Sequence, residues 1–235
     1  MNILTLFRLL RANQWYKNLV IYVAIIFSNL LFDFKLFGLL TLGLISLCLI
    51  SSTNYIINDI VDKKRDREHP EKKLRPIASG KVKVSTAILI AIIIFILGSI
   101  IAYSLSPIFF ISALILFILT FLYSIKLKHI IFLDIIIIST NFVIRAISGT
   151  FIINRILSQW LVLCPFFLAL FLAVGKRHAD LSMLGINAHK HKTVLKDYTP
   201  ELNSVLIIIS STLLIMSYSL YAFLGEHKKL FLTLP

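Results

Sequence analysis

The chain has 235 residues, and its 58% hydrophobic content and mean hydropathy of +0.91 are well above those of a soluble domain. Only 15% of the residues are charged, yet the net charge is +13. The basic residues lie in short stretches between long apolar segments. This pattern indicates membrane topology and attraction to anionic lipids, and binding to nucleic acid is not expected.

The N-terminal apolar run, residues 3–10, is short and is interrupted by Arg8. Residues 1–15 are therefore predicted to form an amphipathic helix on the membrane surface. Downstream, seven segments approach the roughly 20 apolar residues that a spanning helix needs. We expect them at residues 18–32, 36–57, 84–104, 107–125, 130–153, 157–175 and 204–224. They predict an all-α fold, a polytopic membrane helical bundle that forms one domain over residues 1–235.

Most of the 24 lysines and arginines precede the first predicted span or follow the second, fourth and sixth spans. Because positively charged loops stay in the cytoplasm, the N-terminus is expected to be cytoplasmic and residue 235 to lie outside. The loops at residues 58–83 and 176–203 would then form an active site on the cytoplasmic face of the cell (plasma) membrane.

Three aspartates and an asparagine stand at the end of the second predicted span. At about 100° per residue, Asn58, Asp59, Asp62 and Asp66 fall on one face of a helix. Mg²⁺ relieves the repulsion between close carboxylates and shares its other positions with phosphate oxygens and waters. The alternative is a solvated helix end with salt bridges to the interleaved basic residues. The position at a membrane boundary, where ionisable groups are usually functional, favours the metal.

The stretch Asn58-Asp59-x-x-Asp62-x-x-x-Asp66, with its continuation over residues 67–80, resembles the first aspartate-rich motif of the UbiA superfamily of intramembrane prenyltransferases. Within that superfamily, the chain is most similar to decaprenyl-phosphate phosphoribosyltransferases. This closer resemblance is carried by residues 11–18, 123–128, 133–134, 142–146 and 170–181. It implies a helical bundle around a central cavity, usually of nine spans, so the chain is expected to lack the last two helices.

Lys176, Arg177 and Asp180 follow the sixth predicted span, where the superfamily carries a second acidic motif that often has two aspartates. One acid beside two cations suits a donor with more phosphate charge, such as phosphoribosyl diphosphate. The resemblance implies that Asp180 joins the first three aspartates in holding Mg²⁺, and that Lys176 and Arg177 neutralise phosphate. Taken alone the triad is weak, because basic residues after a span are common topology markers.

Further residues are expected to bind substrate, namely Lys17, Asn18, Asn58, Lys73, Arg75, Tyr123, Lys126 and Arg145. Arg145 interrupts the fifth predicted span, where an arginine is costly unless it is paired. It either contacts phosphate or forms a structural salt bridge, and Asp134 lies on roughly the same face of that helix. His189 and His191 diverge on a helix, so we expect them in a solvated loop and not at a metal.

The function predicted is Mg²⁺-dependent transfer of a 5-phosphoribosyl group from phosphoribosyl diphosphate to a polyprenyl phosphate of the decaprenyl type, with release of diphosphate. The partners are these two substrates and membrane lipids, and the oligomeric state stays open. One alternative is a prenyltransferase that moves a prenyl group from its diphosphate to an aromatic or glycerol-phosphate acceptor. A second alternative is a transporter or lipid-binding protein without catalytic activity.

Overall fold

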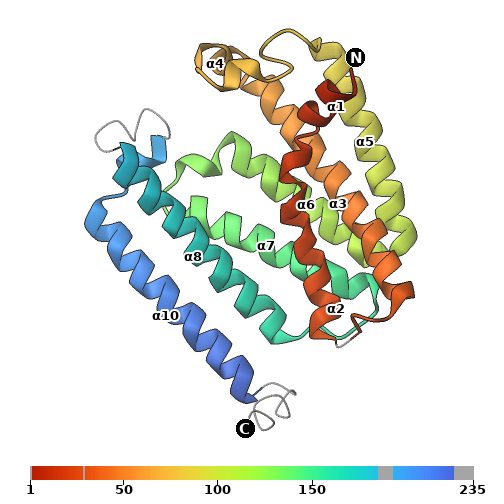
Figure 1. Ribbon diagram of the computed structural model, residues 1–235, viewed down its shortest axis with the longest axis vertical. Helices are drawn as coiled ribbons and strands as arrows, with labels where there is room; N and C mark the ends of the chain where they lie inside the picture. The colour runs from red at the N-terminus through yellow and green to blue at the C-terminus, as the bar shows by residue number, and fades with distance from the viewer. Residues whose placement is uncertain (1, 29, 185–192, 225–235) are drawn as a thin grey trace. The chain divides into compact units, whose positions relative to one another are not determined.

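The computed structural model describes residues 2–28, 30–184 and 193–224, which form helices joined by short connections (Figure 1). The all-α fold expected from the sequence is confirmed. The chain divides into two units, which are described separately. Unit 1 comprises Met1–Ile125 and Ile144–Ile156, and unit 2 comprises Lys126–Val143 and Leu157–Pro235.

Unit 1 begins with a short helix, α1, which Asn2 caps by accepting a hydrogen bond from the backbone N–H of Leu4. The chain turns at Arg11, whose φ of 49° is left-handed, before the next helical segment. Asp33 caps the longest helix, α3, by accepting from two backbone N–H groups. The elements of unit 1 are α1 (Ile3–Leu9), η1 (Ala12–Tyr22), α2 (Val23–Phe27), α3 (Phe34–Val61), α4 (Lys63–Glu68), η2 (Lys72–Leu74), α5 (Val84–Leu105) and α6 (Pro107–Ile125).

Small residues let the helices of unit 1 approach closely. Helices α3 and α5 lie side by side, and Ser46 Oγ donates to the carbonyl oxygen of Gly98 at 2.8 Å (Figure 1). Gly149, late in α7 (Leu133–Ile152), faces η1 so closely that a Cβ there would collide with the carbonyl oxygen of Ile21. Without a hydrophobic driving force between helices in lipid, such close backbone packing is what holds them together.

Unit 2 contains the start of α7 (Leu133–Ile152), and α8 (Gln159–Leu184) and α10 (Pro200–Leu224), which run side by side (Figure 1). Its short elements are η3 (Leu127–His129) and η5 (Thr193–Lys196). Ile135, Ala173 and Val174 form a small buried core, and apolar side chains of α10 pack against it.

Six helices of the described part of the chain, α3, α5, α6, α7, α8 and α10, are long and apolar enough to cross a membrane. The sequence predicted seven, so the number is corrected. The segment expected as a span at residues 18–32 is divided between η1 and α2, which ends at Phe27. Neither η1, which ends at Tyr22, nor α2, which has five residues, reaches the length that a spanning helix needs.

Candidate functional site

The acidic motif lies where α3 passes into α4. Helical hydrogen bonding continues across the junction, because Asp62 N–H donates to Asn58 O at 2.9 Å and Asp66 N–H donates to Asp62 O at 2.8 Å. The two outer acids point inward: Asp59 is 1% exposed and Asp66 is 2% exposed. Asp62 and Asn58 are only partly buried. The helical continuity expected from the spacing is therefore present, with Asp59 and Asp66 as its buried pair.

Arginines from two other segments neutralise this buried pair. Arg75, just after η2, donates from Nη1 to Asp59 Oδ1 at 3.1 Å and to Asp66 Oδ2 at 2.7 Å. Arg11, between α1 and η1, forms a second ion pair with Asp59. Asp62 instead pairs with Arg65 at 2.9 Å. Arg11 was not among the predicted site residues, since nothing in local spacing links it to an acid 48 positions later.

Carboxylate oxygens, such as those of Asp59, Asp62 and Asp66, are the type of ligand that Mg²⁺ prefers. Asp59 Oδ2 is buried and has no hydrogen-bond partner, which is costly unless a cation or water satisfies it. Within the described residues, however, no group of three or more His, Cys, Asp or Glu side chains is gathered in metal-holding geometry. Arg75 bridges Asp59 and Asp66, and Arg11 also pairs with Asp59, so a metal can enter only if these ion pairs loosen.

The loop between α4 and α5 holds Arg75 in place. Arg67 Nε donates to the carbonyl oxygen of Ala78 at 3.0 Å, across eleven residues. His69 Nδ1 accepts from the backbone N–H groups of Glu71 and Lys72, at 3.2 and 3.3 Å. The apolar end of the loop is buried against α1, α3 and α5. Arg75 is thus placed by a packed loop and not by a solvated one.

Polar contacts continue down α3 along the face it presents to η1. Trp15 Nε1 donates to Ser52 Oγ at 3.0 Å, and Asn18 Nδ2 donates to Cys48 Sγ at 3.3 Å. Asp59 extends the same face by about two further turns. Trp15 and Asn18 therefore hold η1 along α3.

Arg145 belongs to the deep end of this row of contacts. Its Nε donates to Asn18 Oδ1 at 2.8 Å, at the level of Cys48. Cys48 lies eleven residues before Asp59, which is about 16 Å along a helix axis. Arg145 is thus held by Asn18 of η1, and Asp134 is paired with Arg177, while the role of Arg145 at a phosphate stays a prediction.

The second predicted constellation is centred on a buried ion pair in unit 2. Arg177 is 4% exposed and donates from Nε to Asp134 Oδ2 at 2.8 Å, and its Nη1 is 3.7 Å from Asp180. Asp134 also accepts from the hydroxyl of Tyr198 at 2.7 Å. Asp134 is thus the partner of Arg177. Lys176, the neighbouring cation, is exposed.

Tyr198 was not predicted to take part in the site. Burial raises the pKa of its hydroxyl, and the hydrogen bond to the Asp134 carboxylate raises it further. The hydroxyl therefore stays protonated and donates to Asp134 at neutral pH. The sequence offered no signal for this role, because the two residues are 64 positions apart.

Four other residues were predicted to bind substrate, and none of them belongs to the ion pairs described above. Lys17 Nζ donates to Gln14 Oε1 at 2.8 Å, and Tyr123 is partly buried at the end of α6. Lys73 and Lys126 are exposed. His189 and His191 lie outside the described residues.

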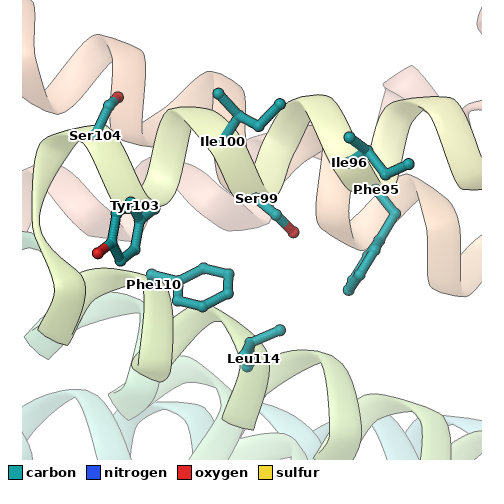
Figure 2. A pocket seen from close by; sticks show the side chains of 8 residues that line it. All are labelled: Phe95, Ile96, Ser99, Ile100, Tyr103, Ser104, Phe110 and Leu114. Carbon is teal, nitrogen blue, oxygen red and sulfur yellow. The ribbon is translucent and has the colours of Figure 1, made fainter.

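A pocket of about 480 Å³ lies between α5 and α6 (Figure 2). Most of its lining side chains are aromatic or aliphatic, among them Phe95 and Phe110, and Ser99 and Ser104 also line it. It sits in the second half of α5, whereas the first half, at Ala87 and Ala91, packs with Ile56 and Ile60 in the part of α3 that carries the acidic motif. The pocket is therefore separate from the acidic site.

Comparisons with known proteins identify the family and the fold. A family model described as the UbiA prenyltransferase family matches residues 19–234. The decaprenyl-phosphate phosphoribosyltransferases of Mycolicibacterium smegmatis and Corynebacterium glutamicum are 32% and 30% identical, over 78% and 93% of this chain. These matches span 58% and 67% of the relatives' own lengths.

Solved structures show the same fold. A UbiA homologue from Archaeoglobus fulgidus, bound to GPP and Mg²⁺, matches with a TM-score of 0.77 at 21% identity, over 94% of this chain and 79% of that chain. A structure of a digeranylgeranylglyceryl phosphate synthase matches with a TM-score of 0.65 at 22% identity, over 92% and 77% of the two chains. Since the family model covers almost the whole sequence, the chain belongs to the UbiA prenyltransferase family.

Proposed function

We propose that the chain catalyses Mg²⁺-dependent transfer of a 5-phosphoribosyl group from phosphoribosyl diphosphate to a polyprenyl phosphate of the decaprenyl type. The observation that carries this proposal is the buried pair Asp59 and Asp66, joined by Arg75 and with one carboxylate oxygen unsatisfied. The relatives named decaprenyl-phosphate phosphoribosyltransferases support the choice of substrates. The basic loop around the motif supports a cytoplasmic active site in the plasma membrane.

Asp59, Asp62 and Asp66 would hold the metal, with Asp59 Oδ2 as the first uncommitted oxygen. When bound, Mg²⁺ supplies charge neutralisation and orientation for the diphosphate leaving group. Asp59 and Asp66 carry two negative charges against the two positive charges of Arg11 and Arg75. A metal alone would make this group strongly positive, so we infer that metal and diphosphate arrive together. Arg75, about a quarter exposed, can then turn from the carboxylates to phosphate oxygens.

The chain's own residues then stabilise the charge that develops. The bond between C1 of the ribose and the diphosphate oxygen breaks, and an oxygen of the lipid phosphate forms the new bond to C1. Negative charge grows on the departing diphosphate, where Arg75 and the exposed Lys73 supply positive charge. The family resemblance implies that Lys176 and Asp180 also bind phosphoribosyl diphosphate. No general base is needed, because a phosphate monoester is already ionised at neutral pH.

The test uses the purified full chain with Mg²⁺, polyprenyl phosphate and labelled phosphoribosyl diphosphate. We expect a labelled lipid that disappears when the metal is chelated and when Asp66 is replaced in Asp66→Asn. The absence of labelled lipid, together with turnover of a prenyl diphosphate, would establish the prenyltransferase alternative. If neither the wild type nor Asp66→Asn turns over phosphoribosyl diphosphate or prenyl diphosphate, the non-catalytic alternative holds.

A further inference from the structure

A buried group of polar side chains, Asp134, Arg177 and Tyr198, holds the end of α8 in place. Asp134, fully buried at the start of α7, accepts hydrogen bonds from Arg177 Nε and from the Tyr198 hydroxyl, at 2.8 and 2.7 Å. The Tyr198 oxygen in turn accepts from the backbone N–H of Phe132 at 3.3 Å. Three segments that are distant in sequence therefore meet at one carboxylate.

The backbone at this junction is held in an uncommon conformation. Phe132 has a φ of 65°, in the left-handed region that a large side chain rarely adopts. Its N–H is bound by Tyr198, and the two rings pack edge to face with centroids 6.4 Å apart. Strain of this kind persists where the surroundings over-determine it, and it is concentrated at functional sites.

Arg177 is committed to this junction. Its two ion-pair partners are Asp134 and Asp180, and its side chain is almost completely buried. To reach a phosphate it would leave the Asp134 carboxylate buried without its cation, which is strongly unfavourable. Lys176 is one position earlier, about 100° around the helix, and is exposed. Lys176 can therefore contact an anion without disturbing any buried pair.

We propose that Asp134, Arg177 and Tyr198 form a positioning junction that sets the direction of Lys176 and Asp180, so that Lys176 and not Arg177 is the cation of this junction that contacts phosphate. This inference rests on the proposed function for its use of a diphosphate donor. It does not depend on whether the donor carries a sugar or a prenyl group. Arg177 and Tyr198 are positioning residues that act through Lys176 and Asp180.

The test is a double-mutant cycle on the purified full chain, read as affinity for inorganic diphosphate in the presence of Mg²⁺. Tyr198→Phe keeps the ring against Phe132 and removes only the hydroxyl. We expect it to weaken diphosphate binding about 5- to 10-fold, the equivalent of one hydrogen bond. In a Lys176→Gln background, the same change should cost less than about 2-fold, because the residue that it positions is gone.

Arg177→Lys gives a second measurement. Lysine keeps the charge but lacks the planar fork that meets Asp134, so we expect a loss at least as large as that of Tyr198→Phe. Wild-type affinity in Arg177→Lys, equal losses from Tyr198→Phe in both backgrounds, or no loss in Lys176→Gln would each overturn the inference. Failure of the proposed function appears elsewhere, as an absence of labelled sugar lipid while diphosphate binding persists.

Discussion

Asp59 and Asp66 share a single donor atom, because Arg75 Nη1 lies 3.1 Å from an oxygen of the first and 2.7 Å from an oxygen of the second. The two acids are seven residues apart, which is about two helical turns, and the continuous helical hydrogen bonding brings both to the same side. Arg75 thus stands where the positive charge of a metal is expected. This relationship leads to the first two predictions.

Replacing one acid of the pair should abolish the reaction without unfolding the chain. For Asp66→Asn, we expect formation of labelled lipid to fall about 100-fold or more, since one preorganised charge is typically worth that much. The measurement is the initial rate at saturating Mg²⁺. Asp33→Asn is the matched control, because Asp33 caps the opposite end of α3 and asparagine caps equally well. A wild-type rate in Asp66→Asn would remove this residue from the site.

Removing the arginine should make stability depend on the metal. In Arg75→Gln, two buried carboxylates lose their shared cation, and we expect a loss of about 3 kcal/mol in the free energy of unfolding. Mg²⁺ should restore part of this loss, since a dication can replace the missing charge. The unfolding temperature in detergent, with and without Mg²⁺, measures this. An equal Mg²⁺ response in the variant and the wild type would argue against metal binding at these acids.

Arg145 and Asn18 should matter for stability more than for substrate binding. Asn18→Ala removes the acceptor of Arg145 Nε and the donor to Cys48, so we expect a loss of about 1–3 kcal/mol. Diphosphate affinity should stay within about 2-fold of wild type, because the acidic pair is about 16 Å away along α3. A large loss of affinity at unchanged unfolding temperature would instead place this pair in the substrate site.

Two glycines provide a test of the packing of unit 1. A Cβ at Gly149 would meet the backbone of η1, so Gly149→Ala should destabilise the chain by about 1–3 kcal/mol. Gly38, also helical, has open space around its Cα, and Gly38→Ala should be neutral or stabilising by up to about 1 kcal/mol. The measurement is the unfolding temperature of each variant relative to the wild type. Equal effects would mean that η1 and α7 do not touch closely at Gly149.

Tyr198 should make the chain sensitive to alkaline conditions. Burial and the bond to Asp134 raise the pKa of its hydroxyl, so the unfolded tyrosine ionises first, near its ordinary value of about 10. Its contribution to stability is therefore fully present below about pH 10 and is lost as the pH rises above it. Tyr198→Phe should be less stable at neutral pH and should lose less stability between about pH 9 and about pH 11. Parallel pH profiles for variant and wild type would contradict this.

Much of the architecture could be predicted because its signals are local. Six of the predicted spans correspond to α3, α5, α6, α7, α8 and α10, since an apolar run of sufficient length must satisfy its backbone within a helix. The prediction of a span at residues 18–32 was wrong. Asn18 is buried and hydrogen-bonded to Cys48 and Arg145, and the chain there forms the 3-10 helix η1. Length and hydropathy do not report such contacts.

The sequence by itself determined the helical membrane class and the family, and it predicted one helical face for Asp59, Asp62 and Asp66. These follow from composition, from local periodicity and from residue order within short motifs. Only the tertiary structure decided which cation meets which acid: Arg11 with Asp59 across 48 residues, and Arg177 with Asp134 across 43. The physical reason is that ion pairs are short-ranged, whereas the approach of distant segments is set by helix packing, which no local spacing encodes.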